Sequence, residues 1–160
     1  MAFIKILVVS AFVSFAFNGG AQSKKEVKKH NIKTSAITNT ENGKISNESK
    51  TTFDSKGNEI EVTEYNKEGN IKEIHKLKYN GEGDEIQDDQ YDINNKFVEK
   101  KITKYNLLGE KTEEQYFDAA NKLTKKHVFL YDGRGLKTER KTLDGTGKLI
   151  STKKYVYTFK

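Results

Sequence analysis

The chain has 160 residues, a formal net charge of +6 and a hydrophobic content of 34%, and much of that apolar content lies within the first 21 residues. So few apolar residues in the remainder favour neither a broad hydrophobic core nor a membrane-spanning helix beyond the N-terminus. The absence of cysteine excludes disulfides, thiol chemistry and thiolate metal sites, and three histidines leave few ligands for any other transition metal.

The N-terminal segment has the pattern of a secretory signal peptide. Lys5 supplies a short basic region, residues 6–17 form an apolar run, and residues 18–21 end it with small and polar side chains. We expect residues 1–21 to be a signal peptide that is cleaved after Ala21, leaving a periplasmic or secreted protein without a transmembrane span. The alternative, a membrane anchor, would need about 20 apolar residues.

Residues 22–38 are predicted to be a linker with a possible first strand. The stretch from Ser23 to His30 is mostly basic and has little apolar surface, so we expect it to be solvated.

Residues 39–160 contain an internal repeat, which is the main signal in the sequence. A mostly aromatic first position is followed by Asp or Asn, two variable residues and then Gly or Asn, as in Tyr65-Asn-Lys-Glu-Gly69. Successive copies from Phe53 onward begin alternately 12 and 14 residues apart, so the period is 26 residues and the segment holds about four and two-thirds repeats.

The repeated pattern predicts turns. Its fifth position holds only the two residue types that enter the left-handed backbone region readily. These turn-defining residues are Gly43, Gly57, Gly69, Gly83, Asn95, Gly109, Asn121, Gly135 and Gly147. The Asp or Asn at the second position suits an Asx hydrogen bond that opens the turn, and a type I turn followed by a left-handed residue is a common hairpin connection. We therefore predict an all-β fold, an antiparallel meander of about nine to ten strands, arranged as an open twisted sheet or a hairpin stack.

Aromatic residues recur at the period of the repeat. Tyr79, Tyr105 and Tyr131 form one such column, and they are the candidate surface-binding residues. The alternative is that these rings only pack the sheet.

The sequence gives little support for a catalytic, metal-binding or nucleic-acid-binding site. His75 and His127 share one repeat offset in a column that we expect to face solvent, and about 19 Å of sheet between them is too far for a shared metal. The acidic residues around Asp88 and Asp89 lack a calcium-loop pattern, and these two carboxylates should point to opposite faces of the sheet. The cationic residues are nearly all lysines interspersed with acids, which argues against nucleic-acid binding.

The aromatic, Asp or Asn, and Gly pattern resembles the YD repeats of RHS-type proteins and is similar to MORN-variant hairpin arrays in secreted proteins of Bacteroidetes-like bacteria. Tyr131-Asp-Gly-Arg-Gly135 is closest to a YD unit. The departures are Asn at positions 66, 80 and 106, Asn in place of Gly at 95 and 121, and the strict alternation of 12 and 14 residues. The resemblance implies a hairpin repeat, but so few repeats do not imply the encapsulating shell of RHS proteins.

We expect an exported, non-catalytic repeat protein that acts as a binding or structural module of the cell envelope or exterior, with no cofactor. Its partner would be a protein or an envelope glycan, and a glycan-binding surface protein is the first alternative. A small secreted hydrolase is the second, and it would need a pocket that so few apolar residues are not expected to enclose.

Overall fold

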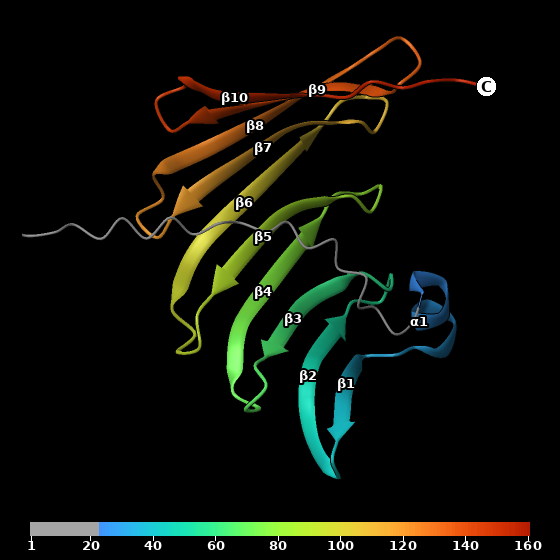
Figure 1. Cartoon of the computed structure of the whole chain (residues 1–160). Coiled ribbons are helices and arrows are strands. Elements are labelled where there is room, and N and C mark those ends of the chain that lie inside the picture. Colours follow the sequence, from blue (N-terminus) through green and yellow to red (C-terminus); the bar gives the residue numbers. More distant parts are fainter. Residues whose placement is uncertain (1–22) are drawn as a thin grey trace, which may run out of the picture.

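The protein is described by a computed structural model that covers residues 23–160 (Figure 1). The predicted signal peptide and its cleavage position lie outside the described residues. Within the described part, the fold is one ten-stranded antiparallel sheet in which every strand pairs with its neighbours in the sequence, from β1 at one edge to β10 at the other. The elements are α1 Lys24–His30, β1 Thr34–Glu41, β2 Lys44–Phe53, β3 Glu59–Tyr65, β4 Ile71–Tyr79, β5 Glu85–Tyr91, β6 Phe97–Tyr105, β7 Lys111–Asp118, β8 Leu123–Tyr131, β9 Lys137–Asp144 and β10 Leu149–Lys154.

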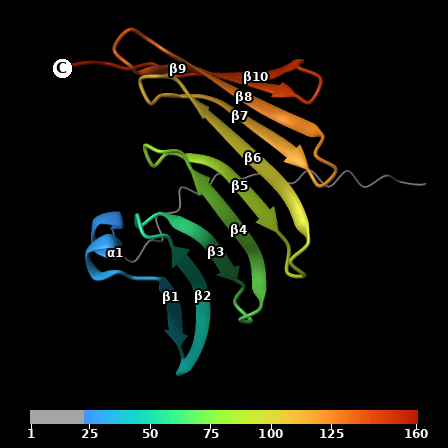
Figure 2. The same cartoon turned by 180° about the vertical axis from the view of Figure 1, so that it is seen from behind.

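The sheet is open and strongly twisted, so the strands of the C-terminal hairpins run in a different direction from β1 and β2 (Figures 1 and 2). The right-handed twist of each strand accumulates along a long meander. The all-β meander predicted from the 26-residue repeat is confirmed.

Nine turns connect the strands, and the eight from Asp54 onward share one design, whereas the β1–β2 turn is a two-residue loop in which both Asn42 and Gly43 have a positive φ. Each residue at the fifth position of the pattern has a positive φ, from 57° at Asn95 to 92° at Gly83. In the turn after β2, the Asp54 carboxylate accepts hydrogen bonds from the backbone N–H groups of Lys56 and Asn58, at 2.8 and 2.9 Å. The same Asx arrangement recurs at Asn66, Asp92, Asn106, Asp118, Asp132 and Asp144. Local side-chain chemistry therefore fixes where each strand reverses.

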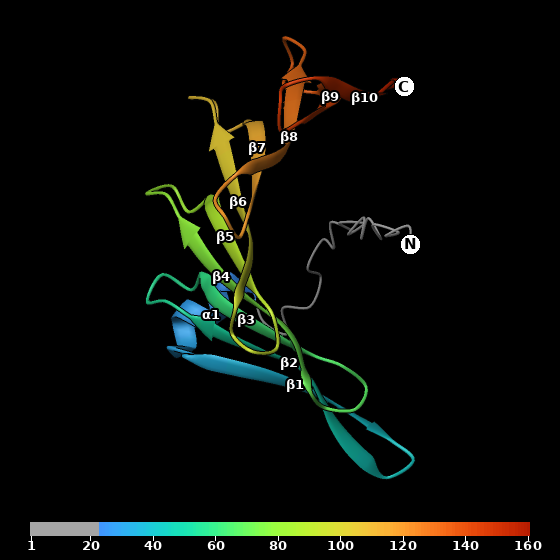
Figure 3. The ribbon, with the colours of Figure 1, turned by 90° about the vertical axis from the view of Figure 1, so that its left-hand side faces the viewer.

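The segment expected to be a solvated linker is exposed except at Val27, but it forms the short helix α1, which was not predicted. Ser23 caps the helix by accepting a hydrogen bond from the backbone N–H of Glu26, and Val27 is only 1% exposed. The helix lies beside the turn between β2 and β3, as Figure 3 shows from the side. Gly57 in that turn approaches so closely that an added Cβ would lie 2.7 Å from the carbonyl oxygen of Lys24. Residues 34–41 form the possible first strand, β1.

Candidate functional site

One face of the sheet carries an open groove of about 890 Å³, lined by side chains from β3 to β9 and by Tyr155. We call this the grooved face. It holds the buried side chains of Val62, His75, Tyr116 and Phe129. The sequence did not lead us to expect such a groove, because a chain poor in apolar residues seemed unable to form one. The groove is built on the face of a sheet instead of inside a core, so few apolar residues are needed.

A column of side chains spaced 13 residues apart runs along the grooved face. Its members are Val62, His75, Asp88, Lys101, Glu114, His127, Arg140 and Lys153. Half a repeat separates neighbours, so each residue is contributed by the next strand along the sheet. Four pairs of these residues lie directly opposite each other in the hairpin ladders: Val62 and His75, Asp88 and Lys101, Glu114 and His127, and Arg140 and Lys153.

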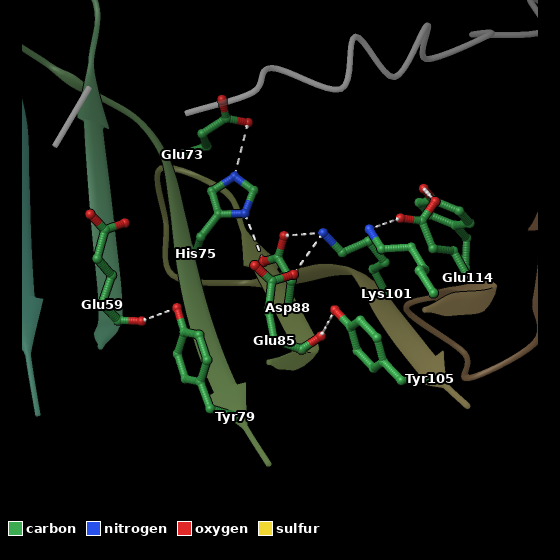
Figure 4. Close-up of polar contacts among 11 residues, drawn as sticks. Glu59, Glu73, His75, Tyr79, Glu85, Asp88, Lys101, Tyr105 and Glu114 are labelled. Atoms are coloured by element: carbon green, nitrogen blue, oxygen red, sulfur yellow. Dashed lines mark hydrogen bonds and ion pairs between the residues drawn. The ribbon is translucent and has the colours of Figure 1, made fainter. Parts of the chain in front are cut away.

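His75 is the centre of a polar network (Figure 4). Its Nδ1 lies 2.8 Å from a carboxylate oxygen of Asp88, and its Nε2 lies 3.8 Å from Glu73. Lys101 bridges Asp88 at 3.4 Å and Glu85 at 2.9 Å. Burial alone would lower the pKa of His75, but the hydrogen bonds and negative charges of Asp88 and Glu73 outweigh burial and raise this pKa to about 9. His75 is thus an imidazolium at neutral pH.

His127 has the opposite environment. Its Nδ1 lies 3.0 Å from the hydroxyl of Thr142, and its ring contacts Tyr116 edge-on at a centroid separation of 5.4 Å. Burial and the positive charges of Arg140 and Lys125 lower the pKa of His127 to about 4. The expectation that both histidines face solvent is therefore wrong: His75 is 7% exposed, and His127 is half-buried. The lysines at the same offset do not indicate exposure here, because Lys101 is itself held in the network by Asp88 and Glu85.

The charge of the grooved face changes sign along the sheet. In one column, Glu59 and Glu85 of the N-terminal half are replaced by Lys111 and Lys137. In a second column, Glu73 and Glu99 give way to Lys125. In the lining contributed by β3–β6, acidic side chains therefore outnumber basic ones. In the lining contributed by β7–β9, the cations Lys111, Lys137 and Arg140 lie among the acids Glu114 and Asp118.

The three tyrosines proposed as surface-binding residues have a role in the fold. The hydroxyls of Tyr79, Tyr105 and Tyr131 donate hydrogen bonds to the backbone carbonyls of Glu59, Glu85 and Lys111, at 2.9, 3.0 and 2.8 Å. Tyr157 repeats this contact with Lys137 at 2.8 Å. Tyr79 lines the groove, whereas Tyr105 and Tyr131 are outside its lining. The nine turn-defining residues lie in the turns at the ends of the strands, where the chain reverses direction.

The residues that the sequence reasoning missed are Asp88, Glu114 and Arg140 as partners of the histidine and lysine column. Their signal was present as a 13-residue offset from His75, Lys101 and His127, but it emerges only when half-repeats are compared. Asp88 and Asp89 lie on opposite faces, because Asp88 contacts His75 while Asp89 accepts a hydrogen bond from Gln87.

The described residues include no cluster of three side chains suited to hold a metal ion. A search of the same residues for a helix able to cross a membrane also gives none. What the groove offers is a set of charged, amide and hydroxyl groups on a rigid sheet, which is chemistry for binding polar ligands.

No family model matches the chain, and no curated protein matches it. Similar solved structures include a protein of unknown function from Bacteroides fragilis, which is 15% identical with a TM-score of 0.43, over 79% of this chain and 96% of that one. TarM is 18% identical with a TM-score of 0.31, over 86% of this chain but only 25% of TarM. A DUF3836 family protein from Parabacteroides distasonis is 18% identical with a TM-score of 0.26, over 71% of this chain and 91% of that one. Similarities at these TM-scores carry no argument about function.

Proposed function

We propose that the chain is an exported, non-catalytic binding module of the cell envelope or exterior, and that the grooved face is its binding surface. The signal-peptide pattern predicted for residues 1–21 supports the location. The observation that carries the proposal is the groove of about 890 Å³, lined by polar side chains that differ from one repeat to the next.

The contrast between turns and groove supports a binding role. The turn position is Gly or Asn in all nine copies, whereas the equivalent groove positions change from acid to base along the chain. Turn residues maintain the scaffold, and a scaffold of repeats presents an extended surface to a partner. A groove with different charges at its two ends distinguishes ligands by their own charge distribution.

A pair of substitutions tests this proposal. Val98 lines the groove and is 43% exposed, so Val98→Arg fills the groove with little effect on the fold. Leu130 is 39% exposed and lies on the opposite face, so Leu130→Arg is the matched control. The wild-type chain and both variants are applied to a glycan array and to a detergent-free envelope extract. We expect Val98→Arg to lose the ligand and Leu130→Arg to retain it. Equal retention by both variants would exclude the groove as the binding surface.

A further inference from the structure

Arg140 and Lys153 interrupt the charge pattern of the grooved face. They lie directly opposite each other on β9 and β10, and both are cations. The equivalent pairs of the two preceding hairpins combine an acid with a base, namely Asp88 with Lys101 and Glu114 with His127. Like charges directly opposite each other on one face of a sheet are destabilising. The last hairpin therefore holds an arrangement that the chain avoids in the two hairpins before it.

A third cation, Lys137, lies near this pair. The Nζ of Lys137 lies 4.7 Å from the ring centroid of Phe129 and 5.8 Å from that of Tyr155, and the Nζ of Lys153 lies 5.6 Å from the same Tyr155 ring. Aromatic rings thus hold the ammonium groups in place. Within residues 23–160, Lys137, Arg140 and Lys153 form no ion pair with a carboxylate within 4.0 Å.

The guanidinium of Arg140 also has hydrogen-bonding capacity to spare. Among the described residues, its Nε is a buried nitrogen atom without a hydrogen-bond partner. A guanidinium edge with two N–H donors matches the two oxygens of a carboxylate. The positive potential here is also felt by His127, whose pKa is lowered by burial and by Arg140 and Lys125. A bound anion would relieve that potential.

We propose that the β8–β10 end of the grooved face binds the carboxylate of an acidic sugar at the end of an oligosaccharide, through Arg140 and Lys137, which line the groove, and through Lys153, which lies opposite Arg140 on β10. This inference rests on the proposed function and names the ligand class of the same groove. Away from this end the groove is lined by Glu73, Gln90 and Glu99, whose side-chain oxygens can accept hydrogen bonds from sugar hydroxyls, and the two carboxylates repel a second negative charge. The ligand is thus anionic at one end and rich in hydroxyls along the rest.

An acidic peptide fits the groove less well than a glycan does. The backbone N–H and C=O groups of the central strands are already paired in the sheet ladders, so the grooved face presents only side chains. An extended peptide in the groove would find no backbone partners for its own amides. Sugar hydroxyls, in contrast, form hydrogen bonds with amide and carboxylate side chains.

Isothermal titration calorimetry with three probes tests the inference. The first probe is a trisaccharide ending in one uronic acid, the second is the same trisaccharide with that carboxylate reduced to the alcohol, and the third is triglutamate. We expect saturable binding of the uronic acid trisaccharide. The reduced form should bind at least about tenfold more weakly, because it lacks the carboxylate and therefore loses the hydrogen bonds between that charged group and the protein cations. Triglutamate should bind no better than the reduced form. Tighter binding of triglutamate than of the uronic acid trisaccharide would indicate that the ligand is an acidic peptide and not a glycan.

Charge variants locate the site. Arg140→Glu restores the acid found at the equivalent positions 88 and 114, so the variant should fold and should bind the uronic acid trisaccharide at least about tenfold more weakly. Arg140→Gln is a second variant with a smaller charge change and should show the same direction. Lys141→Glu makes the same charge change as Arg140→Glu on the next residue, whose side chain faces away from the groove, and should bind like the wild type.

Three outcomes would overturn the inference: no saturable binding of the uronic acid trisaccharide, equal binding of its reduced form, or equal loss in Arg140→Glu and Lys141→Glu. The binding role of the groove is judged separately. If another ligand is lost in Val98→Arg and kept in Leu130→Arg, the groove remains the binding surface, and only the acidic sugar is excluded.

Discussion

His75 and His127 occupy the same position two repeats apart on the same face, yet the pKa of His75 is raised to about 9 and that of His127 is lowered to about 4. Burial lowers the pKa of both rings, and the charges around them separate the two values: Asp88 and Glu73 raise the pKa of His75, whereas Arg140 and Lys125 lower that of His127 further. Asp88, 13 residues after His75, contacts its ring, whereas a cation, Arg140, occupies the equivalent position after His127. One column of the sheet thus holds a charged and a neutral imidazole at neutral pH.

His75 should make the fold less stable in alkaline solution. Its folded pKa of about 9 lies above its ordinary value of 6.5, so the stabilisation is complete below pH 6.5 and is lost as the pH rises through 9. The shift corresponds to roughly 3 kcal/mol in the free energy of unfolding at most. Urea melts between pH 6 and pH 10 measure the effect, and Asp88→Asn should flatten it. An Asp88→Asn variant with the same pH dependence as the wild type would show that Asp88 does not hold the proton on His75.

His127 should act in the opposite direction at low pH. Its folded pKa of about 4 lies below the ordinary 6.5, so the unfolded chain takes up a proton that the folded chain resists. Stability should therefore fall as the pH decreases from 6.5 to 4. Arg140→Glu replaces the nearby cation by an anion and should raise the pKa of His127, which NMR titration of the imidazole protons would measure. An unchanged pKa in this variant would mean that burial and Lys125 set the value without Arg140.

The turn at Gly109 offers a test of the scaffold. Gly109 has a φ of 76°, and an added Cβ would meet no other atom within 4 Å, so backbone strain is the only effect of a substitution there. Gly109→Val should lower the free energy of unfolding by about 1 to 3 kcal/mol. Gly109→Asn should lower it far less, because Asn95 and Asn121 adopt φ values of 57° and 59° at equivalent positions. Thermal melts compare the two variants, and equal effects would refute this description of the turns.

Tyr105→Phe separates a structural from a binding role for the tyrosine column. The substitution removes the 3.0 Å hydrogen bond to the carbonyl of Glu85 and should lower the free energy of unfolding by about 1 kcal/mol. Ligand affinity should stay the same, because Tyr105 does not line the groove. The opposite result, a variant with unchanged stability and weakened binding, would indicate that Tyr105 contacts the ligand.

The turns were predictable from the sequence because their chemistry is local. Asp54 bonds to backbone groups two and four residues away, and the positive φ of Gly109 needs only its own residue type. The polar network of the groove was not predictable from the sequence, because the contact between His75 and Asp88 crosses from β4 to β5 and depends on the register of the two strands. A 26-residue comparison aligns strands two apart and leaves out the neighbours that make the contact.

The helix α1 was missed although its start carries a recognisable signal. Ser23 followed by Glu26 three residues later has the spacing of a helix-capping pair. What could not be seen is the burial of Val27, since it arises only when the helix lies against the turn edge of the sheet. A single apolar residue in a basic stretch does not reveal such a contact by itself.

NMR mapping of ligand contacts is the most direct test of the claim that the grooved face is the binding surface. Titration of the uronic acid trisaccharide into the labelled chain should shift the Arg140 Nε–H and His127 imidazole resonances. It should leave Lys76 and Lys141, whose side chains extend from the opposite face, unchanged. Shifts confined to the opposite face, or to the distant strands β1 and β2, would contradict the account.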